Sequence, residues 1–261
     1  MHKDSQSTAK HEVRYLYQFP LSLYCEKSRW NLDYKKLPYK CVDLIPGFHL
    51  PRARWLCNQS TLPILRDVNT VVGDSVKISS YLEHTYSHNV LLPREPDDRE
   101  KALMLEAYFS EVGIHVRRFV WSLAIESENI DKLFFDFLGY GARARGVGAL
   151  GKSILRQMVR HRFHVYDNKL LTSWGCITAA LAYVEMLLDG DPERYLVSDH
   201  FTLADMTAAS MLGPLIGPKN SPWVDSHVSV AVDTAEMQFS RARARASVAG
   251  QWVARVYETY R

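Results

Sequence analysis

The chain has 261 residues, which is long for one compact domain and sufficient for two. Hydrophobic residues make up 47% and charged residues 23%, an ordinary balance for a globular protein with a sizeable core, and one that excludes general disorder. The net charge of +3 is too small to indicate a nucleic-acid partner, because duplex binding needs a concentrated basic surface.

The amino-terminal residues 1–12 have no apolar run after their basic residues, so they predict a loose tail and not a secretory signal. No run reaches the roughly 18 apolar residues of a membrane span. The four cysteines form no CxxC pair and have no metal-ligand spacing with histidine, so no metal is expected. These features favour a cytoplasmic protein with reduced thiols.

Residues 13–44 predict a strand, a helix and a second strand. Val13–Phe19 is rich in β-branched and aromatic residues, Tyr24–Leu37 carries apolar residues at helical spacing, and Tyr39–Leu44 alternates. Pro38 ends the predicted helix. A strand, a helix and a strand within about 30 residues form a βαβ unit with a parallel strand pair.

Residues 45–60 predict a loop with a short helix, since they contain three helix-breaking residues. Two short strands follow, over Leu62–Arg66 and Thr70–Val72, joined by a turn. Asp74 and Ser75 then occupy the start of a helix that continues to His84. Residues 13–90 therefore predict an α/β domain of the order βαβ, then ββα.

Residues 91–96 form a proline-punctuated linker, and strand signals stop after it. Residues 97–261 predict an all-helical domain, with helices over 97–125, 155–188, 202–212 and 252–260. Five glycines within 139–151 must interrupt the helical pattern there.

This layout resembles the glutathione S-transferase family, whose thioredoxin-like amino-terminal domain precedes an all-helical domain. Four segments carry the resemblance: Phe19–Arg29, Ser60–Leu65, Gly73–Leu82 and Phe201–Asp205. The last is similar to a structural capping-box helix, so it supports the fold and not the activity. The resemblance covers about residues 13–257.

By this resemblance, Ser22 matches the serine that activates the thiol of glutathione in serine-type members. A free thiol has a pKa of about 8.5, so a hydroxyl donor beside a helix N-terminus would favour its thiolate. Cys25, in the first helical turn, is the rival catalytic residue, and burial as a small core residue is the alternative for it. Gln18 aligns with the position of the catalytic tyrosine in tyrosine-type members, which argues against a tyrosine mechanism.

The resemblance also implies how glutathione is held. The backbone of Leu62, before a cis Pro63, pairs with the cysteinyl part, and Asp74 and Ser75 hold the γ-glutamyl end. At a helix N-terminus these two residues suit an ammonium and a carboxylate, although a simple helix cap is the alternative. The glycyl carboxylate needs a cation, for which the candidates are His49, Arg52, Arg54 and Lys77.

The second substrate is expected against the long helix of the second domain and beside Tyr24. Tyr108, Val112 and His115 lie at helical spacing there, with plain core packing as the alternative. Residues 137–166 hold six arginines or lysines and no acid. This basic segment fits a solvated face or the recruitment of an anionic substrate, and it leaves membrane contact open although none is expected.

The predicted function is a glutathione-dependent transferase acting on an electrophilic, partly apolar small molecule. The alternatives are a thiol transferase or reductase that uses Cys25, and a non-catalytic glutathione-binding scaffold. The lack of a CxxC pair counts against the former, and the intact Leu62–Pro63 and Asp74–Ser75 segments count against the latter. Glutathione is expected as a co-substrate, and family resemblance implies a homodimer and a role in detoxification.

Overall fold

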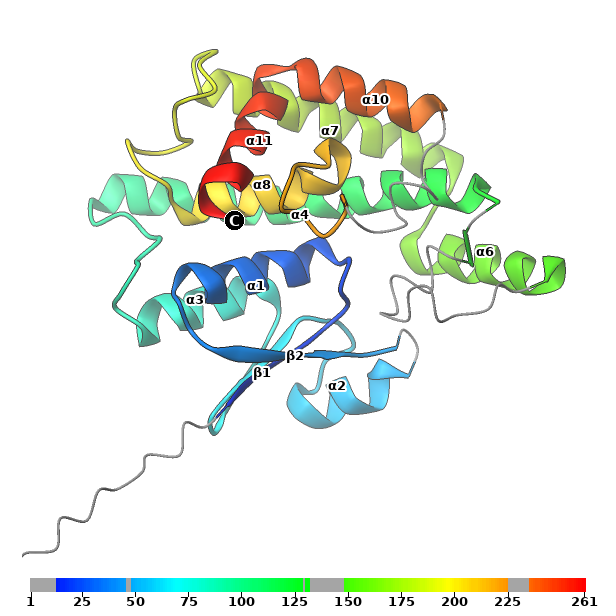
Figure 1. The fold of residues 1–261 in the computed structure, drawn as a ribbon, viewed down its shortest axis with the longest axis horizontal. Coiled ribbons are helices and arrows are strands. Elements are labelled where there is room, and N and C mark those ends of the chain that lie inside the picture. Colours follow the sequence, from blue (N-terminus) through cyan, green and yellow to red (C-terminus); the bar gives the residue numbers. More distant parts are fainter. Residues whose placement is uncertain (1–12, 46–47, 129, 132–147, 225–234) are drawn as a thin grey trace, which may run out of the picture.

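A computed structural model describes residues 13–45, 48–128, 130–131, 148–224 and 235–261 (Figure 1). A small sheet with three helices forms the first layer, and long helices form the second (Figure 1). The predicted tail at 1–12 and the part of the basic, glycine-rich segment before residue 148 lie outside the described residues.

The first domain has the predicted element order: β1 (Arg14–Gln18), α1 (Leu23–Tyr34), β2 (Tyr39–Asp43), α2 (His49–Cys57), β3 (Ile64–Asp67), β4 (Thr70–Gly73) and α3 (Ser75–Thr85). The strand order is β2-β1-β3-β4, with β1 parallel to β2 and the other pairs antiparallel. Helices α1 and α3 lie on the side of the sheet that faces the helical domain, whereas α2 lies on the other side (Figure 1). The expected thioredoxin-like domain is confirmed.

The second domain is all-helical in its described part, as expected. It comprises α4 (Pro96–Glu126), α6 (Ala149–Phe163), α7 (Asp167–Leu187), α8 (Leu203–Ile216), α10 (Ala235–Ala246) and α11 (Val248–Tyr260). Helix α8 begins with a capping box, in which the Asp205 carboxylate accepts the backbone N–H of Thr202 at 2.8 Å. Nearly all of α8 is buried against α4, α1 and α11, so it forms the centre of the core.

Several predicted helix boundaries were wrong. Helix α8 continues to Ile216, beyond the expected Leu212, and α11 begins at Val248, before the expected Trp252. The helix expected over 155–188 is two helices, because His164 adopts a left-handed conformation with φ of 52° and ends α6. The first helix ends at Tyr34, three residues before the expected Leu37. There Lys36 has a positive φ of 53°, which turns the chain before Pro38.

Helix α7 contains the stretch Asn168–Leu187, which among the described residues is long and apolar enough to cross a bilayer, with a mean hydropathy of 1.4. The sequence predicted no membrane-spanning segment because no run of apolar residues is uninterrupted over the required length. The mean hydropathy of this stretch stays high even though it includes the charged Lys169. Every third or fourth residue of α7 is buried, and the helix packs on α4 and α11. One-sided burial of this kind is typical of a helix that packs on the surface of a globular domain by one face.

Candidate active site

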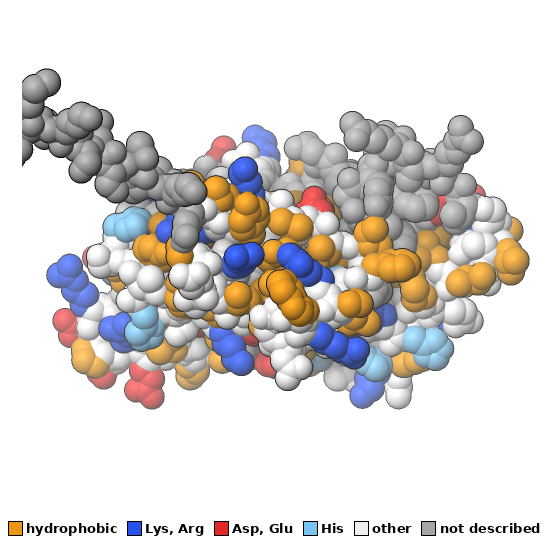
Figure 2. Space-filling model, turned by 90° about the horizontal axis from the view of Figure 1, so that it is seen from below, with side chains coloured by type: hydrophobic (Ala, Val, Ile, Leu, Met, Phe, Trp, Pro, Cys, Tyr) orange, Lys and Arg blue, Asp and Glu red, His pale blue; other side chains and the backbone are white. Residues whose placement is uncertain are grey.

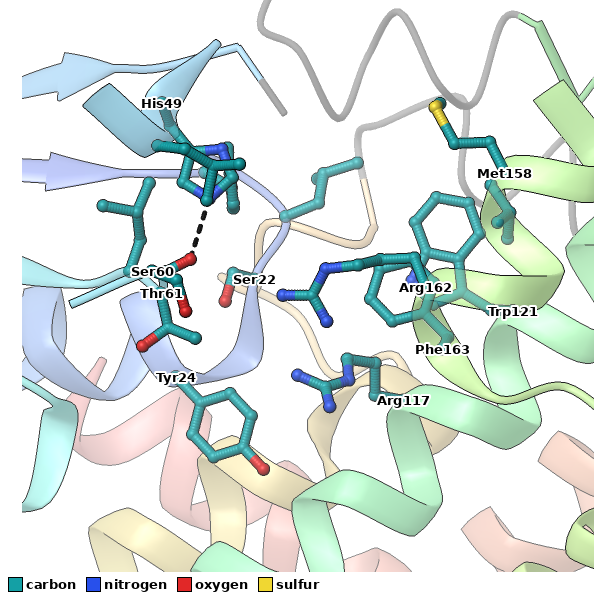
Figure 3. Close-up of a pocket in the computed structure, with 15 residues that line it drawn as sticks. Ser22, Tyr24, His49, Ser60, Thr61, Arg117, Trp121, Met158, Arg162 and Phe163 are labelled. Carbon is teal, nitrogen blue, oxygen red and sulfur yellow. Dashed lines mark hydrogen bonds between the residues drawn. The ribbon is translucent and has the colours of Figure 1, made fainter. Parts of the chain in front are cut away.

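A pocket of about 480 Å³ lies between the two domains. The first domain contributes the amino-terminal end of α1, the start of α2 and the segment before β3, and the second contributes α4 and α6 (Figure 3). The first-domain residues that line it are Phe19, Leu21, Ser22, Tyr24, His49, Leu50, Ser60, Thr61 and Leu62. The second-domain residues are Arg117, Trp121, Met158, Val159, Arg162 and Phe163.

Ser22 is the N-cap of α1 and lines the pocket. Its Oγ accepts the backbone N–H of Cys25 at 3.5 Å, which is a long capping contact. A hydroxyl has one proton to donate as well as lone pairs to accept with, and it can rotate to present that proton either to the neighbouring Cys25 thiol, whose pKa this contact acts to lower, or to the pocket. This hydroxyl can therefore donate to a ligand atom in the pocket, where the helix N-terminus also favours a negative charge.

Tyr24 lies two residues further along α1 and reaches across to the second domain. Its hydroxyl donates to the carbonyl of Ser110 on α4 at 2.9 Å. Burial raises the pKa of Tyr24 to about 12, so the side chain stays protonated at neutral pH. This close approach depends on Gly113, because a Cβ there would lie 3.0 Å from the Tyr24 hydroxyl and closer still to Met211.

Cys25 does not line the pocket. Its side chain is fully buried in the core of the first domain with Tyr17 and Ile64. Burial raises the pKa of the Cys25 thiol, which opposes formation of the reactive thiolate. The structure thus gives Cys25 the place of a small core residue, and its predicted catalytic role has no geometric support.

The Leu62–Pro63 peptide bond is cis, as the family resemblance predicted. Leu62 lines the pocket, as do Ser60 and Thr61, which precede it in the chain. The carbonyl of Pro63 accepts the backbone N–H of Asp74 at 3.2 Å, which fixes the start of α3 against this segment. The two segments predicted to hold glutathione are therefore joined directly.

Asp74 and Ser75 do not line the pocket itself. Asp74 caps α3, since its Oδ1 accepts the backbone N–H groups of Val76 and Lys77 at 2.9 and 3.3 Å. Ser75 is buried, and its carbonyl accepts the hydroxyl of Ser79. Asp74 remains exposed and its charge acts on the pKa of Tyr24, so its predicted contact with the γ-glutamyl end stays a prediction.

His49 lines the pocket, but it does not supply the cation that the glycyl carboxylate needs. Its Nε2 lies 3.1 Å from the Ser60 carbonyl oxygen, to which it can only donate. Burial lowers the pKa of His49, which favours the neutral imidazole. Arg52 also points elsewhere, because it donates to the hydroxyl of Tyr17 and lies over the Trp55 ring.

Among the described residues, the cations that line the pocket are Arg117 and Arg162. Arg117 was not predicted, whereas Arg162 lies in the basic segment 137–166, for which recruitment of an anionic substrate was one of the predicted roles. The Arg117 guanidinium lies 5.7 Å from the Tyr24 ring centre and 5.3 Å from that of Phe163. Arg162 lies at the mouth, over Phe163 at 5.6 Å. Figure 3 shows both guanidinium groups directed into the space in front of Ser22.

Behind these arginines, Trp121 and Phe163 form a parallel aromatic stack. Their ring centres are 5.0 Å apart and their planes differ by 9°. Arg118, next to Arg117, donates to the Phe163 carbonyl and to the Ser173 hydroxyl, so it holds the end of α6 against α4. The aromatic wall is thus positioned by a neighbouring cation that itself does not face the pocket.

Tyr108, Val112 and His115 were predicted to contact the second substrate, and none of them lines the pocket. Tyr108 packs edge-on against Tyr183, Val112 is buried, and His115 Nδ1 lies 3.1 Å from the Ser173 hydroxyl. Gly113, Arg117 and Trp121, spaced four residues apart, form the stripe of α4 that faces the first domain. The predicted stripe lies on a different side of the helix.

Residues 16–90 match the family described as the N-terminal domain of glutathione S-transferase. A curated relative, glutathione S-transferase 1 of Dianthus caryophyllus, is 36% identical over 104 residues. That match covers 39% of this chain and 46% of the relative, so the chain spans about half of the relative's length. The fold and the Ser22 and Leu62–Pro63 segments agree with these matches. Residues 16–90 form an N-terminal domain of the glutathione S-transferase family.

Solved structures of glutathione S-transferases share the fold over nearly the whole chain. One from Ceriporiopsis subvermispora, in complex with glutathione, has a TM-score of 0.62 at 17% identity and covers 95% of this chain and 97% of its own. One from Methylobacterium radiotolerans, in complex with glutathione sulfonate, has a TM-score of 0.55 at 21% identity, with 91% and 92% covered. At these identities the likeness establishes the fold alone.

Proposed function

We propose that this chain binds glutathione along Leu62 and uses Ser22 to stabilise its thiolate, which attacks an electrophilic, partly apolar small molecule. The observation that carries the proposal is the Ser22 hydroxyl, which caps α1, lines the pocket and can turn its proton toward a ligand there. The thiolate sulfur would form a bond to the electrophilic carbon, and the leaving group would depart with its electron pair.

The charge of the pocket supports the same proposal. The described residues that line it include two arginines and no carboxylate, so the pocket favours the thiolate over the thiol. A free thiol is about 3% ionised at pH 7, and each unit by which its pKa falls is worth about 1.4 kcal/mol. A hydroxyl donor, a helix N-terminus and nearby guanidinium groups all act in that direction.

Two alanine variants test the role of Ser22, with glutathione and chlorodinitrobenzene as substrates. Ser22→Ala should lower kcat by tens of fold or more, because it removes a donor to a developing negative charge. Cys25→Ala is the matched control from the same helical turn, and its kcat should stay within about twofold because the thiol is buried outside the pocket.

The opposite result in these two variants would overturn the serine mechanism. Full turnover by Ser22→Ala, with loss in Cys25→Ala and a glutathione adduct on Cys25 by mass spectrometry, would favour the thiol transferase. If calorimetry detects no binding of glutathione at millimolar concentration, the chain is a scaffold of the same fold.

We also propose that the chain forms a homodimer through α4 and α7. Tyr108 and Tyr183 contact each other across these helices with ring centres 5.3 Å apart. Beside them, Met104 is 53% exposed and Met186 is 66% exposed, so an apolar surface faces solvent in the single chain. Sedimentation should give about twice the monomer mass of 30.0 kDa, and Met186→Glu should shift it to the monomer.

A further inference from the structure

Arg117 is a half-buried cation without a counter-ion among the described residues. No described hydrogen bond or ion pair engages its guanidinium, which contacts only the ring faces of Tyr24 and Phe163. Burial lowers the pKa of Arg117, and the charges of Arg162 and Arg118 act in the same direction. The other arginines beside this site differ, since Arg118 and Arg156 both donate to backbone carbonyls.

A half-buried guanidinium is stable when something replaces its lost hydration. Aromatic faces do this in part. An anion does it better, because carboxylates, sulfonates and phosphates accept the parallel N–H groups of a guanidinium. Arg162, directed into the same space from α6, doubles the positive charge there (Figure 3).

The anionic groups of glutathione are expected elsewhere. Its γ-glutamyl end is predicted at Asp74, and its cysteinyl part at Leu62. The glycyl carboxylate is predicted at Arg54 or Lys77, the first-domain candidates that remain after His49 and Arg52. Arg117 and Arg162 project from α4 and α6 in the second domain, on the opposite side of the pocket (Figure 3). The two guanidinium groups therefore face the space left for the second substrate.

The same side of the pocket is also lined by apolar side chains. Trp121 and Phe163 are stacked in parallel, and Met158 and Val159 lie on the adjoining turn of α6. An aromatic ring packs well against side chains of this kind. The pocket thus combines a ring site with an anion site.

Building on the proposed function, we infer that the preferred electrophile is an aromatic molecule bearing a carboxylate, sulfonate or phosphate. Its ring packs on Trp121 and Phe163, and its anionic group binds Arg117 and Arg162. The arginines act as specificity-determining residues, because they choose among electrophiles that the thiolate could attack equally well.

Chlorodinitrobenzoate and its methyl ester test this inference, since they share the ring and leaving group and differ by one negative charge. The ratio of their kcat/KM values, each divided by the uncatalysed rate, should favour the carboxylate by about tenfold or more. Arg117→Met and Arg162→Met should each remove most of this preference through KM. Arg160→Met is the matched control on α6, because Arg160 does not line the pocket and its ratio should not change.

A binding measurement separates this inference from the proposed function. Dinitrobenzoate and its methyl ester lack the leaving group, so calorimetric titration reports their affinities whether or not the chain is catalytic. Tighter binding of the anion, lost in Arg117→Met and Arg162→Met, supports the inference even if conjugation is absent. Equal affinity and equal turnover for acid and ester overturn it, although conjugation that depends on Ser22 would leave the proposed function intact.

One further result would overturn the inference. If the two arginines served only the glutathione thiolate, both variants would raise the pKa of the bound thiol. The absorbance of the thiolate measures that pKa. They would then slow both electrophiles equally, and the ratio between acid and ester would not change.

Discussion

The two walls of the pocket are built from different chemistry. The first-domain wall presents short-range hydrogen-bonding groups: the Ser22 hydroxyl at a helix N-terminus and the backbone around Leu62. The second-domain wall presents guanidinium groups and a Trp121–Phe163 stack on two long helices. The first wall suits one thiol in a fixed register, whereas the second suits a class of molecules recognised by charge and shape.

This difference fits a division of labour between the domains. A hydroxyl and backbone groups act only over hydrogen-bond distance, so they must sit on a rigid element such as the capped end of α1. Charge acts over a longer range and a flat ring surface tolerates several ring types, so the second wall can vary while the first is retained.

The largest expected effect comes from breaking one of the contacts that join the two domains. Lys27 on α1 and Glu106 on α4 form a buried ion pair at 2.6 Å. Glu106→Ala leaves an unpaired buried ammonium, so the free energy of unfolding should fall by about 3–5 kcal/mol. Urea denaturation measures it. The double variant Lys27→Met/Glu106→Leu should recover much of the loss, and its failure to do so would mean that shape rather than charge matters there.

A smaller effect is expected when acid protonates Glu26. This α1 residue forms an ion pair with Arg261 at the carboxyl terminus. Burial acts to raise the pKa of Glu26, but Arg29 and Arg261, at 2.6 and 2.7 Å, outweigh it and lower that pKa. The unfolded state therefore binds the proton first. The stabilisation is complete above the ordinary glutamate pKa of about 4.3 and is lost as pH falls through the lower folded pKa.

Glu26→Gln provides the check on this pH dependence. Urea unfolding is measured between about pH 7 and about pH 3, a range that brackets the ordinary glutamate pKa. Over this range the free energy of unfolding should fall less steeply with decreasing pH in the variant. The variant should nevertheless be less stable than the unchanged chain at each pH. An unchanged slope would assign the acid sensitivity to other carboxyl groups.

The smallest expected effect comes from removing one hydrogen bond between the two domains. Tyr24 belongs to the first domain, yet its hydroxyl donates to Ser110 of the second. Tyr24→Phe keeps the ring beside Arg117 and removes one hydrogen bond, so stability should fall by about 0.5–1.5 kcal/mol. Because the pKa of Tyr24 is raised to about 12, the alkaline limb of the pH–rate profile should not move. A shift of that limb would assign Tyr24 a role in proton transfer.

The sequence alone determined features that depend on local chemistry. The proline and serine after β1 predicted a capped helix start at Ser22, and the alternating segments predicted the βαβ unit. The capping box at Thr202 and Asp205 was equally readable. Each of these depends on backbone propensity or on a bond between residues a few positions apart, so neighbouring residues suffice to specify it.

Only the tertiary structure decided which helix faces meet at the pocket. Helix α4 presents apolar residues on several sides, and its packing against α1, α7 and α8 directs Arg117 and Trp121 inward while Tyr108 faces outward. Likewise, Cys25 and Ser75 follow pocket-lining or capping residues by one to three positions, yet the helical turn buries them. Side-chain direction on a helix changes by about 100° per residue, so the surrounding elements, and not the sequence spacing, determine which residues reach the substrate.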